Sequence, residues 1–308
     1  MDSALSLEGV SKRYGRFEAV KDLSFAVEPG TICGFLGPNG AGKTSTLRMI
    51  LGLTDPNAGR ITVLGADNGG KVRDRIGFLP EERGLYRKMT PVDAIAFFAA
   101  LKGVPMGEGR KRARRLLEEQ GLADSMKKPM KALSKGMAQK VQLMASIAHE
   151  PELVILDEPF SGLDPVNQEG LEQIIRGLAS RGATVLFSTH VMQHAERLCQ
   201  KVVLLAKGRK VFEGSVAAAR AEAPMHLEIE GRVTAADVAA LPGVAAVESV
   251  AVEGEEDGVY AHSASLAKTA DPQAALKAAF SRGLDVRRFE MKPPTLHDAF
   301  IVLTGGDR

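Results

Sequence analysis

A glycine-rich turn between a buried strand and a helix constrains the fold of this chain more than any other feature. The apolar run Ile32–Leu36 is typical of a fully buried strand, and apolar residues recur with helical spacing from Leu47 to Leu51. The turn between them fits the pattern G-x-x-x-x-G-K-[ST] over the residues Gly37, Pro38, Asn39, Gly40, Ala41, Gly42, Lys43 and Thr44. This succession predicts an α/β fold built around a phosphate-binding loop.

Each residue type in this loop suits phosphate binding. Glycines allow backbone N–H groups to close round phosphate oxygens without a Cβ in the way, and the helix N-terminus adds the positive end of its dipole. Lys43 offers a mobile cation for the β- and γ-phosphates, and the Thr44 hydroxyl offers a ligand for Mg²⁺. We therefore expect residues 37–44, with the adjoining Ser45, to bind a nucleoside triphosphate and Mg²⁺.

Composition and charge indicate a globular chain of two domains. The 308 residues are 44% hydrophobic and 25% charged, and no apolar run approaches the ~20 residues needed to cross a bilayer. Residues 1–224 carry 32 Lys and Arg against 25 Asp and Glu, whereas residues 225–308 carry 8 against 13. This reversal predicts a boundary near Pro224 and domains over 1–222 and 223–308. Cys33 and Cys199 lack metal-ligand spacing, which favours buried free thiols.

Polar residues follow three further predicted strands. Glu81 comes after one strand, Asp157 and Glu158 follow the apolar run Leu153–Leu156, and His190 ends another strand. In an open parallel sheet, ligands bind beyond the carboxyl ends of the strands. These side chains are therefore expected to lie beside the phosphate loop.

Helical patterns between residues 86 and 150 predict a helical subdomain. Its run Arg110–Arg115 is basic, but it is short and has no interleaved aromatic residues, so a solvated helix face is favoured over nucleic-acid binding. Ser134 precedes a helix that extends to His149. On physical grounds alone Ser134 is a plain N-cap, although the same helix N-terminus can also form a second anion site.

In order and spacing, these features resemble the nucleotide-binding subunit of ATP-binding cassette (ABC) transporters over roughly residues 5–215. The resemblance depends on Tyr14, the loop Gly37–Thr44, LSKGM at 133–137, LVILDE at 153–158, SGLD at 161–164 and His190. It implies a P-loop NTPase of the ABC type, with a parallel-sheet core, an antiparallel β subdomain and a helical subdomain. The chain departs from the family's usual LSGGQ at Lys135 and Met137, and Glu81 stands where Gln is usual.

The resemblance also implies roles for these residues. It assigns catalysis to Lys43, Glu158 and His190, and Mg²⁺ binding to Thr44, Glu81 and Asp157. Glu158 would orient or deprotonate the attacking water, and His190 would contact the γ-phosphate. The implied cofactors are ATP and Mg²⁺.

Three further residues are implied to bind nucleotide. Tyr14 would stack on the adenine ring. Ser134 and Gly136 would contact the γ-phosphate bound by another subunit, so the implied partner is a second copy of this chain or a related cassette subunit.

Residues 225–303 predict a small α+β domain in the order βαββαβ, which suits a ferredoxin-like split unit. Its strands Val244–Val252 and Val259–His262 are expected to flank an acidic turn, Glu253–Gly258. The ending PTLHDAF at 294–300 resembles the C-terminal extension of sodium-extrusion-type and related ABC-2 exporter ATPases. A stabilising, a dimerising and a regulatory role for this domain all stay open.

These features together favour an ATP-binding and hydrolysing subunit that dimerises on ATP and drives a separate membrane permease. The resemblance implies a cytoplasmic protein, peripheral on the inner face of the cell membrane and working in export. The alternative is a soluble ABC ATPase of DNA repair or translation. Such proteins usually carry two cassettes or a long coiled-coil insertion, whereas this chain has one phosphate loop and no heptad run.

Overall fold

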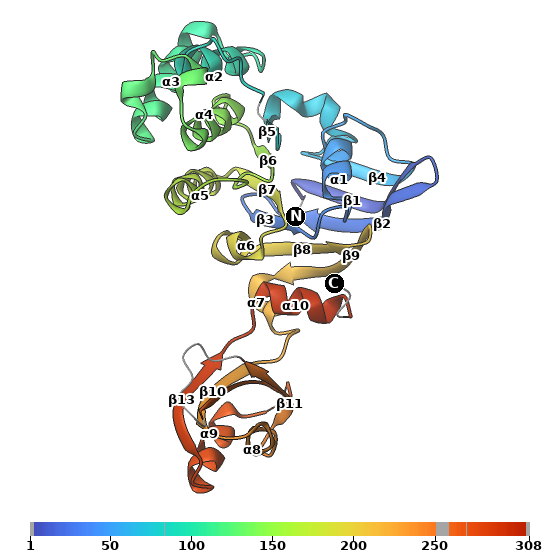
Figure 1. The fold of residues 1–308 in the computed structure, drawn as a ribbon. Coiled ribbons are helices and arrows are strands. Elements are labelled where there is room, and N and C mark those ends of the chain that lie inside the picture. The colour runs from blue at the N-terminus through green and yellow to red at the C-terminus, as the bar shows by residue number, and fades with distance from the viewer. Residues whose placement is uncertain (1–2, 83, 251–258, 269, 306–308) are drawn as a thin grey trace. The chain divides into compact units, whose positions relative to one another are not determined.

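The computed structural model describes residues 3–82, 84–250, 259–268 and 270–305. Two compact units make up the chain, residues 1–216 and 217–308 (Figure 1). The boundary predicted from the charge reversal, at 222/223, lies a few residues further along the chain.

A six-stranded sheet forms the centre of the first unit. Its order is β5 (Ile76–Leu79), β6 (Leu153–Asp157), β7 (Thr184–Thr189), β3 (Ile32–Leu36), β8 (Lys201–Ala206) and β9 (Arg209–Ser215). Neighbouring strands are parallel except for β8 and β9. Strands β3, β6 and β7 are buried throughout, which explains their unbroken apolar sequences. The four strands predicted to end in polar residues are neighbours, so their carboxyl ends meet at one edge of the sheet.

A second, three-stranded antiparallel sheet has the order β2 (Phe17–Val27), β1 (Leu5–Tyr14) and β4 (Ala58–Val63). Strand β2 is continuous through Asp22, although Asp22 has a positive φ of 49°. Helix α1 (Lys43–Ile50) packs with both sheets in one apolar core that includes Leu23, Phe35 and Leu47.

Helices α2 (Pro91–Ala100), α3 (Met106–Glu119) and α4 (Lys135–Ile147) form the predicted helical subdomain around their own core. Short 3₁₀ turns cover Gly69–Arg75 (η1), Ala123–Ser125 (η2) and Met130–Ala132 (η3). Figure 1 shows α4, α5 (Pro165–Ser180) and α6 (Met192–Leu198) along one face of the six-stranded sheet, and α7 is Val216–Arg220. Within the described ranges, no helix combines the length and apolar character of a membrane span.

The second unit has the predicted βαββαβ order, followed by a last helix. Its elements are β10 (His226–Arg232), α8 (Ala235–Ala239), β11 (Val244–Val250), β12 (Tyr260–Leu266), α9 (Pro272–Ser281), β13 (Asp285–Lys292) and α10 (Leu296–Leu303). All strand pairs are antiparallel, and the sheet order β11-β12-β10-β13 is that of a ferredoxin-like split unit. The predicted turn Glu253–Gly258 and the predicted strand end at Val252 lie outside the described residues.

Candidate nucleotide site

Glycine backbone determines the conformation of the phosphate loop between β3 and α1. Gly40 and Gly42 have φ angles of 80° and 101°, in the region that L side chains rarely adopt. A Cβ at Gly42 would lie 2.5 Å from the backbone oxygen of Ala19, so a larger residue does not fit. Gly42 is also the N-cap of α1, and glycine has no side chain with which to cap a helix. The first N–H groups of α1 are therefore available to an anion.

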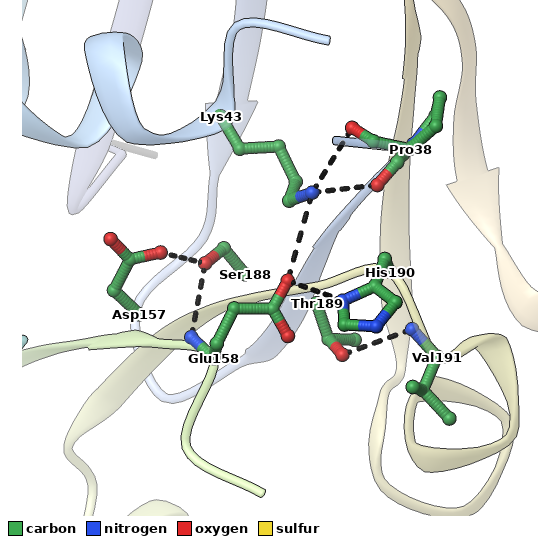
Figure 2. Close-up of polar contacts among 9 residues, drawn as sticks. Pro38, Lys43, Asp157, Glu158, Ser188, Thr189, His190 and Val191 are labelled. Atoms are coloured by element: carbon green, nitrogen blue, oxygen red, sulfur yellow. Dashed lines mark hydrogen bonds and ion pairs between the residues drawn. The ribbon is translucent and has the colours of Figure 1, made fainter. Parts of the chain in front are cut away.

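Lys43 folds back over this loop. Its Nζ donates to the backbone oxygens of Gly37, at 2.6 Å, and Pro38, at 3.3 Å, and lies 3.7 Å from Oε1 of Glu158 (Figure 2). Burial lowers the pKa of Lys43, while the carboxylates of Glu158 and Asp157 act in the opposite direction. The structure thus joins the loop lysine to the acidic residues at the end of β6.

Asp157 is the last residue of β6 and lines the cavity. The Ser188 hydroxyl donates to Asp157 Oδ1 (Figure 2). Burial raises the pKa of Asp157, which the hydrogen bonds from Ser188 and Thr44 partly offset. Hydroxyl and carboxylate oxygens are suitable Mg²⁺ ligands, and Thr44, Asp157 and Glu81 line the same cavity.

Glu158 and His190 meet across the neighbouring strand ends. Glu158 Oε1 lies 2.9 Å from Nδ1 of His190, and the Glu158 N–H donates to the Ser188 hydroxyl oxygen at 3.3 Å (Figure 2). Glu158 has a φ of 46°, a left-handed conformation that is uncommon for a residue other than glycine. This turn directs the chain away from β6 immediately after Asp157. One carboxylate oxygen therefore contacts both Lys43 and His190.

A cavity of about 220 Å³ collects most of the predicted site residues. Its lining comprises Phe17, Ala19, Asn39, Gly40, Gly42, Lys43, Thr44, Ser45, Glu81, Asp157, Glu158 and His190. Six predicted nucleotide-binding residues are not in this lining: Gly37, Pro38 and Ala41 belong to the phosphate loop itself, and Tyr14, Ser134 and Gly136 lie elsewhere in the chain. The convergence predicted from the four strand ends is thus present in the structure.

Phe17 lines the cavity although the sequence did not single it out. It is the cross-strand partner of Tyr14 at the end of the β1–β2 hairpin, and its side chain is 63% exposed. Tyr14 instead lies with Lys12 Nζ 5.3 Å from its ring centre. The sequence signal that could have identified Phe17 is a second aromatic residue three positions after Tyr14, in the same hairpin. The adenine-stacking role of Tyr14 stays a prediction.

Ser134 and Gly136 begin α4. The Ser134 hydroxyl accepts a hydrogen bond from the N–H of Met137, at 3.3 Å, which is the geometry of an N-cap. A Cβ at Gly136 would lie 2.3 Å from the Asn167 side chain, so α4 approaches the start of α5 closely here. The role of both residues toward another subunit stays a prediction.

The fold and the cavity together define a P-loop nucleotide-binding protein. Residues 20–161 match the family model described as ABC transporter. The chain is 37% identical over 302 residues to the ABC transporter ATP-binding protein YhaQ of Bacillus subtilis (strain 168), and the match covers 98% of both chains. The chain therefore belongs to the ABC transporter family, whose ATP-binding subunits bind and hydrolyse ATP.

Two further comparisons agree with this assignment. The Nod factor export ATP-binding protein I of Rhizobium leguminosarum bv. viciae is 35% identical over 308 residues, covering 98% of this chain and 95% of its own. The solved structure of an ATP-binding subunit of an ABC transporter superposes with a TM-score of 0.65 at 32% identity, covering 71% of this chain and 92% of that chain. The predicted family and fold class are thus confirmed.

Proposed function

We propose that this chain hydrolyses Mg-ATP in the cavity around Lys43 and that hydrolysis drives export through a membrane permease. The observation that carries this proposal is the contact of one Glu158 carboxylate oxygen with both Lys43 and His190. Phosphoryl transfer depends on charge neutralisation and on in-line positioning of water, and these three residue types supply both.

Each residue has a distinct part in the proposed reaction. Lys43 and the open N-terminus of α1 stabilise the negative charge of the phosphates. The Glu158 carboxylate orients the attacking water or accepts its proton. His190 donates a hydrogen bond to a γ-phosphate oxygen, for which its half-exposed ring at the cavity wall is suited.

The residues Thr44, Asp157 and Glu81 fit a magnesium site. Their oxygens line one cavity, and the Ser188 hydroxyl fixes the orientation of the Asp157 carboxylate. When bound, Mg²⁺ would neutralise charge on the β- and γ-phosphates. Glu81 keeps a carboxylate oxygen at the position where the family usually has a Gln amide oxygen.

The proposed working form is a dimer with a second copy of this chain or a related cassette subunit. This proposal is supported by the positions of Ser134 and Gly136. Both lie at the N-terminus of α4, and neither lines the cavity around Lys43. In the dimer, the N-terminus of α4 contacts the γ-phosphate of the partner's nucleotide, and Tyr14 stacks on the adenine of its own.

Coupling to a permease is proposed from the family and from the surface of the helical subdomain. Tyr86 and Leu101 are 57% and 64% exposed there, and Tyr86 packs edge-on against Phe97. Such exposed apolar side chains suit a protein interface. The subunit would lie on the inner face of the membrane, and the similarity to a Nod factor export protein supports a role in export.

Substitution of Lys43 by Ala tests the proposed hydrolysis. The substitution removes the cation nearest to the phosphates, so steady-state hydrolysis of Mg-ATP by the full chain should fall by roughly 10²-fold or more. Lys71→Ala is the matched control, because Lys71 forms an exposed ion pair with Asp67 and is not among the residues that line the cavity. Near-normal hydrolysis by a folded Lys43→Ala chain would overturn the proposed function.

A further inference from the structure

The two segments that carry Glu158 and His190 touch a second time, through residues that do not line the cavity. Phe160 follows Glu158 by two residues, and His194 lies on α6, four residues after His190. The two rings are stacked, with centroids 4.2 Å apart and planes inclined by 21°. Phe160 is 4% exposed and His194 is 5% exposed, so the contact is buried. The Glu158–His190 hydrogen bond is therefore accompanied by a ring stack between the same two segments.

The segment around Phe160 is held from two other sides. The Phe160 ring packs edge-on against Phe187 of β7, with centroids 5.9 Å apart and planes at 84°. The side-chain amide of Gln139, which is buried on α4, donates to the backbone oxygen of Pro159 at 3.2 Å. Phe160 consequently has a fixed place relative to the sheet, against which a second ring can be positioned.

The ring of His194 is fixed by its own contacts. Arg197 Nη2 donates to His194 Nδ1 at 3.2 Å and lies 2.7 Å from Oε1 of Glu172 on α5. Burial and the Arg197 cation lower the pKa of His194, which agrees with a neutral ring that accepts from Arg197. The contacts from Glu172 on α5 to Arg197 and from Arg197 to His194 thus fix α6 at the point where His194 meets Phe160.

We propose that the Phe160–His194 stack positions Glu158 and His190 for ATP hydrolysis. Both residues act through their neighbours, since neither lines the cavity. The stack fixes the spacing between the segment after β6 and the segment after β7. A displacement of about 1 Å at reacting groups can cost about 10² in rate, so this spacing sets the turnover number. This inference rests on the proposed hydrolysis.

Two substitutions of His194 separate the ring contact from the polar contact. His194→Gln removes the ring and keeps a polar group, whereas His194→Phe keeps a stacking ring and loses the bond from Arg197. The measurements are kcat for Mg-ATP and the Kd of a fluorescent ATP analogue, on the full chain at pH 7.5. His194→Gln should lower kcat about tenfold with Kd changed by less than about twofold, and His194→Phe should restore kcat to within about threefold of wild type.

A double-mutant cycle tests whether Phe160 and His194 act as one unit. Phe160→Leu removes the other ring, so the double variant Phe160→Leu/His194→Gln should be no slower than the slower single variant. His149→Gln is the control, because His149 hydrogen-bonds to the backbone oxygen of Ile76 away from the cavity. It should keep kcat within about twofold of wild type.

Each contrary result has a defined meaning. A wild-type kcat in His194→Gln, equal losses in His194→Gln and His194→Phe, or fully multiplicative effects in the cycle would overturn the positioning role. Loss of analogue binding in step with kcat would show a purely structural contact and would overturn it too. A wild-type chain without ATPase activity would instead overturn the proposed function, and this inference with it.

Discussion

Acidification is expected to destabilise this protein through His149, which follows α4. His149 Nε2 lies 3.1 Å from the backbone oxygen of Ile76, while Nδ1 is buried and, among the described residues, has no hydrogen-bond partner. Burial, followed by the cation of Lys102, lowers the pKa of His149 from 6.5 to about 4. The folded chain therefore resists a proton that the unfolded chain accepts.

The sign and size of the effect follow from these two pKa values. Between pH 6.5 and about 4 the unfolded state binds up to one more proton at this residue than the folded state, so the free energy of unfolding falls as the pH falls through this window. Above pH 6.5 both states carry a neutral ring, and the contribution is constant. Integration between pH 7.5 and 5 gives a loss of about 2 kcal/mol from this single residue.

Urea unfolding followed by circular dichroism measures this loss. Wild type and His149→Gln are compared at pH 7.5, 6.5, 5.5 and 5, because Gln can still donate to Ile76 but does not titrate. Wild type should lose about 2 kcal/mol more than the variant over this range. The lowered pKa of His194 acts in the same direction in both proteins and cancels in the comparison. Parallel stability curves would refute the assignment to His149.

Three further predictions concern the site and the domain organisation. Glu158→Gln should bind ATP without cleaving it, so ATP-bound dimers should accumulate in light scattering; a variant that stays monomeric in saturating Mg-ATP would contradict a homodimer. Glu81→Ala should raise the Mg²⁺ concentration needed for ATPase activity, while Glu81→Gln keeps an oxygen ligand and should retain much of the activity. Superimposable Mg²⁺ titrations of wild type and Glu81→Ala would exclude the metal role. Residues 1–222 alone should fold and bind ATP, since every residue lining the cavity lies within them; a folded truncation that fails to bind would show that the second unit completes the site.

The sequence predicts which residues gather at the cavity because its motifs lie at strand ends. Once the chain folds as an open parallel sheet, the positions of Gly37, Glu81, Asp157 and His190 follow from the strand order, which places β5, β6, β7 and β3 side by side. Each of these motifs depends on local backbone geometry, such as the positive φ of Gly42. Local rules therefore suffice for most of the cavity.

Strands that carry no motif, and features that depend on side-chain direction, are not predicted. Strands β8 and β9 are absent from the predicted elements, since no polar motif follows them and β9 is only partly buried. Phe17 lines the cavity at the end of a hairpin whose β1–β2 pairing contains register shifts, which the residue pattern does not reveal. The Phe160–His194 stack likewise depends on the rotation of α6 about its axis.

At Glu158, the left-handed backbone lowers the stability of the fold, whereas the side chain is needed for the proposed activity. A φ of 46° costs a residue with a Cβ about 1 kcal/mol, and glycine would adopt this conformation freely. Glycine at position 158 would thus relieve the backbone but remove the carboxylate proposed to activate water. Selection or engineering for thermal stability alone would favour an inert protein at this position, so the glutamate is maintained by the chemistry of its side chain and against the preference of its backbone.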